Sequence, residues 1–231
     1  MDPLQLRERE IFETLKKLKK FRFVIIGGYA ANAYTLPRFS VDCDIVIEDT
    51  DESRKIEGVL IKNGYAKVLS PKMREAYHSA FERYEKDLGN GFRVSIDILI
   101  AEVSDRQTMA VFPAEWIFSN SSIRTLKGRT ITEALKARIV NIDALFVMKF
   151  ISCRATDIRD IFMLVPNVVD KDWIMNEISS RYNFDAPFIK IEAKITSKQF
   201  RDGLQGVYGL LDGVAFEKHK NAVLGLRTRS S

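Results

Sequence analysis

The chain has 231 residues, of which 46% are hydrophobic and 29% charged, and its net charge at pH 7 is +5. This composition excludes a disordered chain and predicts a globular protein with a large core. No apolar run is long enough to cross a bilayer, and the charged opening MDPLQLRERE is unlike a signal peptide. We therefore expect no membrane contact and a cytoplasmic location, while the basic charge permits a polyanionic partner such as RNA without requiring one.

The hydrophobic pattern predicts helices and strands that do not follow a regular βαβ repeat. In chain order we expect a helix over 4–20, a strand over 21–26, a helix over 29–36, a strand over 41–49, a helix over 53–63, a strand over 66–70 and a long strand over 92–103. A β-like piece over 134–140 then precedes helices that begin after Asn141 and near 157, 170 and 197. The expected fold class is α+β (mixed α/β): a small mixed sheet with flanking helices over residues 1–140, and a helical C-terminal domain over 141–231.

Three aspartates lie inside the apolar strand candidates. Asp42 and Asp44 alternate with hydrophobic residues in VDCDIVI, and Asp97 lies within VSIDILI. Period-two alternation puts Asp42 and Asp44 on one strand face, and Asp97 reaches the same surface if the two strands are neighbours. An unpaired buried charge is costly, and adjacent carboxylates repel each other. We therefore predict that the three bind a divalent cation, Mg²⁺ or Mn²⁺.

Gly27 and Gly28 stand where a strand ends and a helix begins, thirteen residues or so before the Asp-x-Asp pair. Backbone N–H groups at a helix N-terminus bind phosphate oxygens, and glycine lets the backbone approach them closely. A nucleoside triphosphate (NTP) carrying Mg²⁺ would join the glycines to the aspartates. Asp97 would then complete a two-metal arrangement or act as the base on an attacking hydroxyl. The chain has neither a P-loop nor a G-x-G-x-x-G motif.

The segment GGYAANAYTLPRFSVDCDIVI resembles the signature of the polymerase-beta-like nucleotidyltransferases. The pattern Arg-x-Ser-x-Asp-x-Asp over 38–44 is similar to that of the AbiE-type enzymes, which include abortive-infection and toxin–antitoxin proteins. Their second block has a lysine on a helix, then an arginine, then an Asp-x-x-Asp pair. The stretch MKFISCRATDIRDIF matches this block with Lys149, Arg154, Asp157 and Asp160.

This resemblance implies an enzyme in which an acceptor hydroxyl attacks the α-phosphorus of an NTP such as ATP. The implied metal ligands are Asp42, Asp44 and Asp97, and the implied nucleotide-binding residues are Gly27, Gly28, Arg38, Ser40, Lys149 and Arg154. Lys149 would neutralise triphosphate charge, and Asp157 or Asp160 would orient it or the acceptor. The implied acceptor is RNA such as tRNA, a protein or a small molecule, and an antitoxin partner is a further implication.

Simpler readings stand beside this one. Lys149 on an apolar helix is compatible with a lysine that extends its amine to solvent, and the charges around it with ordinary surface ion pairs. A non-catalytic nucleotide- or partner-binding protein on the same fold is the main alternative, and a metal-dependent phosphohydrolase is a third. The retention of three carboxylates favours the nucleotidyltransferase, and the absence of nearby histidines disfavours the hydrolase.

Overall fold

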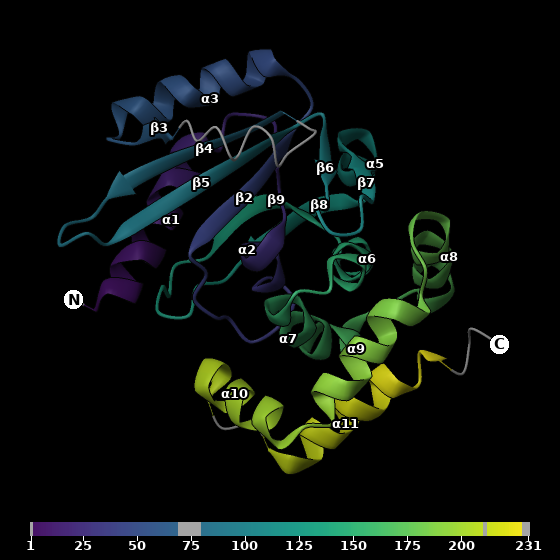
Figure 1. Cartoon of the computed structure of the whole chain (residues 1–231). Helices are drawn as coiled ribbons and strands as arrows, with labels where there is room; N and C mark the ends of the chain where they lie inside the picture. The colour runs from purple at the N-terminus through teal and green to yellow at the C-terminus, as the bar shows by residue number, and fades with distance from the viewer. Residues whose placement is uncertain (1, 69–79, 210–211, 228–231) are drawn as a thin grey trace.

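A computed structural model of the chain describes residues 2–68, 80–209 and 212–227 (Figure 1). The helices are α1 (Pro3–Leu18), α2 (Gly27–Ala31), α3 (Thr50–Lys62), α5 (Ala114–Ser119), α6 (Ile142–Ser152), α7 (Ala155–Leu164), α8 (Lys171–Arg181), α9 (Asp185–Ile195), α10 (Lys198–Tyr208) and α11 (Gly213–Leu224). The strands are β1 (Val24–Ile25), β2 (Asp42–Ile47), β3 (Ala66–Val68), β4 (Ala80–Asp87), β5 (Arg93–Ile100), β6 (Glu102–Ser104), β7 (Val111–Pro113), β8 (Ser121–Leu126) and β9 (Leu135–Val140). The expected mixed α/β class with a helical C-terminal region is confirmed.

Within the described residues, seven strands form one mixed sheet in the order β3-β4-β5-β2-β1-β9-β8, and β6 pairs with β7 in a separate ribbon. The central pair β2 and β5 is parallel, whereas β4 is antiparallel to β5 and β1 is antiparallel to β2. Helices α1 and α3 contact the sheet through β5 and β2. Figure 1 shows helices α6 to α11 grouped together on the opposite side of the molecule from α3.

The alternation of β2 separates the acidic residues from the core. Cys43, Ile45 and Ile47 are fully buried and belong to the hydrophobic cluster that includes Phe12 and Leu15 of α1. The other strand face carries Asp42 and Asp44, which remain partly exposed. One face of β2 therefore belongs to the core, while the other carries the two aspartates at the start of the strand and the buried Val46 after them.

Several predicted elements differ in extent from the observed ones. The expected strand over 21–26 contains only the two residues of β1, and the expected helix over 29–36 is instead α2, which begins at Gly27 and ends at Ala31. The expected long strand over 92–103 is interrupted at Ala101, whose φ of 67° lies in the left-handed region. This turn ends β5 and lets β6 leave the main sheet, because a single residue with positive φ redirects an extended chain. The last residues of the expected strand over 66–70 lie outside the described residues.

Helix α6 begins at Ile142, next to the expected boundary at residue 140, and Asn141 caps it by accepting a hydrogen bond from the N–H of Ala144 at 2.9 Å. The division into two domains stays a prediction. Helices α9 and α11 were not expected from the sequence, and they bury Phe188, Ile191 and Phe216 in the same core as the sheet. Among the residues that the structure describes, none of the helices is both long and apolar enough to span a bilayer.

Candidate active site

Strand register brings the three aspartates together. In the parallel pair of β2 with β5, Asp44 lies opposite Asp97, and Asp42 lies opposite Ser95 two residues earlier. One carboxylate oxygen from each of Asp42, Asp44 and Asp97 lies within 4.8 Å of the others. Side chains at paired positions of neighbouring parallel strands point to the same face of the sheet. The strands that carry Asp42 and Asp44 on the one hand and Asp97 on the other are therefore neighbours, as the predicted site required.

Asp44 is the carboxylate that most needs a cation. In the part of the chain that the structure describes, no side chain donates a hydrogen bond to it or forms an ion pair with it. Burial, followed by the nearby charges of Asp42 and Asp97, raises the pKa of Asp44 well above its usual range. An unpartnered carboxylate beside two others is the donor set that a hard divalent cation prefers, so the cluster fits a metal such as Mg²⁺.

Asp97 already has a cation beside it, which sequence reasoning missed. Arg83 on β4 lies opposite Asp97 in the antiparallel register of β4 with β5. Its Nε and Nη2 donate to the two Asp97 oxygens at 2.8 and 2.6 Å, and the same Nη2 lies 3.8 Å from Asp42. In the sequence, Arg83 is one of two basic residues inside FERYEKD, and only the strand pairing shows that it faces the aspartates.

The glycine turn lies directly against the acidic cluster. Gly27 has a φ of 65°, and a Cβ at this position would stand 2.1 Å from an Asp44 carboxylate oxygen. A Cβ on Gly28 would stand 2.4 Å from the Ser40 hydroxyl and 3.1 Å from an Arg38 nitrogen. The backbone at Gly27 and Gly28 therefore lies closer to the Asp44 and Ser40 side chains than a residue with a Cβ would allow.

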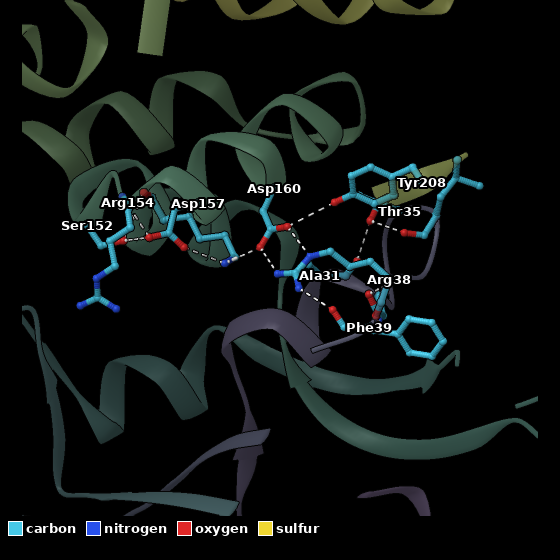
Figure 2. Close-up of polar contacts among 12 residues, drawn as sticks. Ala31, Thr35, Arg38, Phe39, Ser152, Arg154, Asp157, Asp160 and Tyr208 are labelled. Atoms are coloured by element: carbon cyan, nitrogen blue, oxygen red, sulfur yellow. Dashed lines mark hydrogen bonds and ion pairs between the residues drawn. The ribbon is translucent and has the colours of Figure 1, made fainter. Parts of the chain in front are cut away.

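A buried ion network faces this turn from α6 and α7 (Figure 2). Lys149 lies 2.7 Å from Asp160 and 3.0 Å from Asp157. Burial alone would lower the pKa of Lys149, but the Asp160 and Asp157 carboxylates outweigh it and raise that pKa. Both carboxylates thus keep the Lys149 amine charged inside the protein. The simpler interpretation, in which this lysine extends its amine to solvent, does not describe the structure.

Arg38 binds Asp160 from the opposite side. Its Nε and Nη2 donate to the two Asp160 oxygens at 2.8 and 2.7 Å, and the Tyr208 hydroxyl donates to Asp160 at 3.3 Å, as Figure 2 shows. Burial opposes the ionisation of Asp160, yet Lys149 and Arg38 outweigh it and lower the pKa of Asp160 to about 2. These contacts engage the Arg38 guanidinium with Asp160. The expected binding of nucleotide by Arg38 stays a prediction.

Asp157 and Arg154 lie at the tight turn between α6 and α7. Cys153 between the helices has a φ of 44°, and this left-handed residue lets α7 fold back toward Lys149. Asp157 accepts hydrogen bonds from the Ser152 hydroxyl at 2.6 Å and from the Arg154 backbone N–H at 3.2 Å. The Arg154 side chain remains 53% exposed and pairs with the buried Asp105 at 2.9 Å.

These groups border one open cavity of about 660 Å³. Its walls carry the carboxylates of Asp42, Asp44, Asp97 and Asp157, intermixed with the cations of Arg38, Arg83, Arg106, Lys149, Arg154 and Arg159. Gly27, Gly28 and Ser40 complete the wall at the start of α2. A volume of this size suits a small-molecule ligand, and the mixture of carboxylates and cations suits a metal-bound polyphosphate.

The structure therefore brings every predicted site residue to one cavity: Gly27, Gly28, Arg38, Ser40, Asp42, Asp44, Asp97, Lys149, Arg154 and Asp157. Asp160 lies behind them, fully buried against Lys149 and Arg38. Sequence reasoning missed Arg83, Arg106 and Arg159 in the same wall. The roles assigned to these residues stay predictions, since proximity by itself assigns no chemistry.

The architecture is that of nucleotidyltransferases. MenT4, a nucleotidyltransferase toxin from Mycobacterium tuberculosis, superposes with a TM-score of 0.60 and 14% identity over 98% of this chain and 84% of its own. JHP933 from Helicobacter pylori gives a TM-score of 0.57 and 16% identity over 99% of this chain and 94% of its own. A putative nucleotidyltransferase from H. pylori gives 0.54 and 15% over 99% and 96% of the two chains.

Sequence comparison adds nothing to these structural similarities: no family model matches the chain, and no curated protein matches its sequence. At identities this low, the structural likeness establishes the fold, and the activity has to be argued from the site.

Proposed function

We propose that this protein is a metal-dependent nucleotidyltransferase, which transfers a nucleoside monophosphate from an NTP to an acceptor hydroxyl. The observation that carries the proposal is the register of Asp44 opposite Asp97, with Asp42 beside them and Gly27 in contact with Asp44. It supports a metal at the aspartates and phosphates at the start of α2, within one cavity. A nucleotidyltransferase toxin with a similar fold lends it further support.

In the proposed reaction, the acceptor oxygen bonds to the α-phosphorus and the bond from that phosphorus to the β-bridging oxygen breaks. Pyrophosphate leaves, and the hydroxyl proton passes to a carboxylate of the cluster or to solvent. Bound metal would supply Lewis-acid stabilisation of the developing negative charge. The chain's own groups hold the phosphates at the backbone N–H groups of Gly27 and Gly28, with the Ser40 hydroxyl next to them.

Lys149 is the proposed electrostatic stabiliser. It borders the cavity opposite Asp44, and its charge is maintained by Asp160 and Asp157, which we propose as positioning residues. A preorganised cation stabilises a transition state without reorienting, because its partners already hold it in place. Arg154, more than half exposed at the rim, is the proposed phosphate ligand among the arginines, and Arg38 contributes through Asp160.

The resemblance of the Arg-x-Ser-x-Asp-x-Asp segment to AbiE-type enzymes, together with a structural neighbour that is a toxin, supports a toxin of a toxin–antitoxin pair acting in the cytoplasm. The proposed acceptor is RNA, a protein or a small molecule. A nucleotide-binding protein without catalysis is the remaining candidate, and the bidentate Arg83 contact to Asp97 favours it, since it occupies the third carboxylate.

The decisive experiment incubates the protein with Mg²⁺, total RNA, total protein and each NTP, labelled in parallel at the α- or the γ-phosphate. We expect label to transfer from the α-phosphate alone, and to be lost in Asp44→Asn but kept in Asp51→Asn, whose side chain is 76% exposed on α3. Transfer from the γ-phosphate, or equal transfer by Asp44→Asn, would contradict the proposal. Mg²⁺-dependent NTP binding without any transfer would favour the binding protein.

A further inference from the structure

A second, smaller cavity adjoins the open one and has a different character. Its volume is about 140 Å³, and its apolar walls come from Ile26, Leu99, Val103, Phe112, Leu145 and Met148. Leu99, Phe112, Leu145 and Met148 are each at most 9% exposed. The walls thus come from the ends of β1 and β5, from the β6–β7 ribbon and from α6, which lies below that ribbon in Figure 1.

The two cavities are joined at the residues proposed for phosphate and metal. Gly27, Asp44, Lys149, Arg154 and Asp157 border both of them. A ligand that places charged phosphates among the polar groups of the large cavity can therefore extend an attached uncharged group into the small one. Within an NTP that group is the nucleoside, because the phosphates and their metal require polar surroundings.

The small cavity matches a base in size and polarity. An apolar cavity of roughly 150 Å³ in a protein interior takes a benzene ring, so a void of about 140 Å³ that also opens to a larger cavity has room for an aromatic base. Phe112 is held in place by Trp116, whose ring centroid lies 5.3 Å away, and by Arg181 at 5.4 Å. The hydroxyls of Ser104 and Ser152 line the same space and keep acceptor lone pairs for the edge of a base.

An acceptor fits this position less well than a base does. The small cavity is walled by buried side chains, and the ion pair of Asp105 with Arg154 lies at its polar end. The large cavity is bordered by exposed groups, including Val41, which is 60% exposed. A macromolecular acceptor is too large for a cavity of about 140 Å³, whereas a base is small enough to enter it.

We infer that the apolar cavity formed by Leu99, Val103, Phe112, Leu145 and Met148 binds the base of the NTP. This inference rests on the proposed function. It assigns affinity for the nucleoside to side chains outside the acidic cluster, and it separates base recognition from phosphate recognition. Stacking and burial of one base contribute roughly 1–3 kcal/mol, so the nucleoside is expected to strengthen binding about 5- to 150-fold over the bare polyphosphate.

The test compares two probes by calorimetry in Mg²⁺: each of the four NTPs, and inorganic tripolyphosphate, which lacks a nucleoside. Val103→Trp places an indole in the cavity from the partly buried β6 position, and Met148→Phe is a second filling variant. Val111→Trp is the matched control, because Val111 lies on β7 next to Phe112, is 40% exposed and does not border the cavity. Thermal unfolding verifies that each variant is folded.

We expect the tightest NTP to bind wild type and Val111→Trp at least about fivefold more strongly than tripolyphosphate does. Val103→Trp and Met148→Phe should lose that difference while their tripolyphosphate affinity stays within about twofold. NTP affinity that is unchanged in both folded filling variants would overturn the base site and leave the proposed function intact. Failure of wild type to bind either probe would overturn the proposed function, and the base site with it.

Discussion

Arg83 and Asp97 form a bidentate ion pair across two antiparallel strands, with N–O distances of 2.8 and 2.6 Å. Burial raises the pKa of Asp97, and the Arg83 guanidinium opposes part of that rise. The pair therefore places a protein cation where a third metal ligand was expected. A metal bound by all three aspartates would compete with Arg83 for Asp97, and Arg83, which also lies 3.8 Å from Asp42, reduces the negative charge of the whole cluster.

Replacing Arg83 is expected to strengthen metal binding. In Arg83→Leu the freed Asp97 carboxylate adds its charge to the cluster, and we expect the Mn²⁺ affinity without nucleotide to rise about tenfold. Electron paramagnetic resonance titration of free Mn²⁺ measures this. Arg93→Leu is the control, since Arg93 starts β5 and is 65% exposed in its pair with Glu85. Equal affinities in all three proteins would show that Arg83 does not compete with metal.

Asp44→Asn is expected to stabilise the metal-free protein. The raised pKa of Asp44 means that its ionised form is disfavoured in the folded state, so at neutral pH the charge costs stability. Removing it should raise Tm by a few degrees, because about 1 kcal/mol corresponds to roughly 2–4 °C in a chain of this length. Added Mg²⁺ should raise the Tm of wild type and leave that of Asp44→Asn unchanged. A lower Tm for metal-free Asp44→Asn would refute this.

Arg38 is expected to matter for stability through Asp160. Arg38→Gln leaves a fully buried carboxylate with one cation fewer, and the expected loss in the free energy of unfolding is about 3–5 kcal/mol. Urea denaturation measures it. Arg54→Gln provides the comparison, since the Arg54 pair with Asp51 is 76% exposed on both sides and should change stability by less than about 1 kcal/mol. Similar losses in the two variants would contradict the structural role of Arg38.

The low pKa of Asp160 predicts a specific acid sensitivity. Its folded value of about 2 lies below the unfolded value of about 3.9, so the ionised carboxylate stabilises the fold above pH 4 or so. That contribution, about 2–3 kcal/mol, is lost as pH falls from about 4 to about 2. The difference in unfolding free energy between wild type and Asp160→Asn should shrink over the same interval. A difference independent of pH would exclude this explanation.

Two glycine-to-alanine changes should have opposite effects. At Gly27 the φ of 65° and the approach of an Asp44 oxygen to 2.1 Å of a Cβ leave no room for alanine. Gly27→Ala should lower stability by more than about 1 kcal/mol and weaken Mn²⁺ binding. Gly58→Ala in α3, where a Cβ would have no neighbour within 4 Å, should instead stabilise by about 0.5–1 kcal/mol. Chemical denaturation with Mn²⁺ titration tests both, and similar effects at the two sites would refute the steric argument.

The amino-acid sequence predicted those local features that residues close together in the chain decide. The alternation in VDCDIVI predicted which face of β2 carries Asp42 and Asp44, because side chains of a strand alternate in direction. A helix start directly after Asn141 was predicted, and the Asn141 side chain caps α6, because a cap needs only the N–H groups of the next turn. The spacing of Lys149 and Asp157 placed both at the junction of two helices.

Strand order and side-chain partners depended on contacts between distant segments. The pairing of Arg83 with Asp97 follows from the β4–β5 register, and the contact of Arg38 with Asp160 joins residues 122 positions apart. The apolar cavity beside Gly27 exists because Ala101 turns the chain into β6 and sets Val103 and Phe112 over α6. The sequence by itself determined which groups are available for chemistry, since composition and periodicity are local properties. Only the tertiary structure decided which of those groups face the cavity and which are already paired, because pairing requires long-range packing.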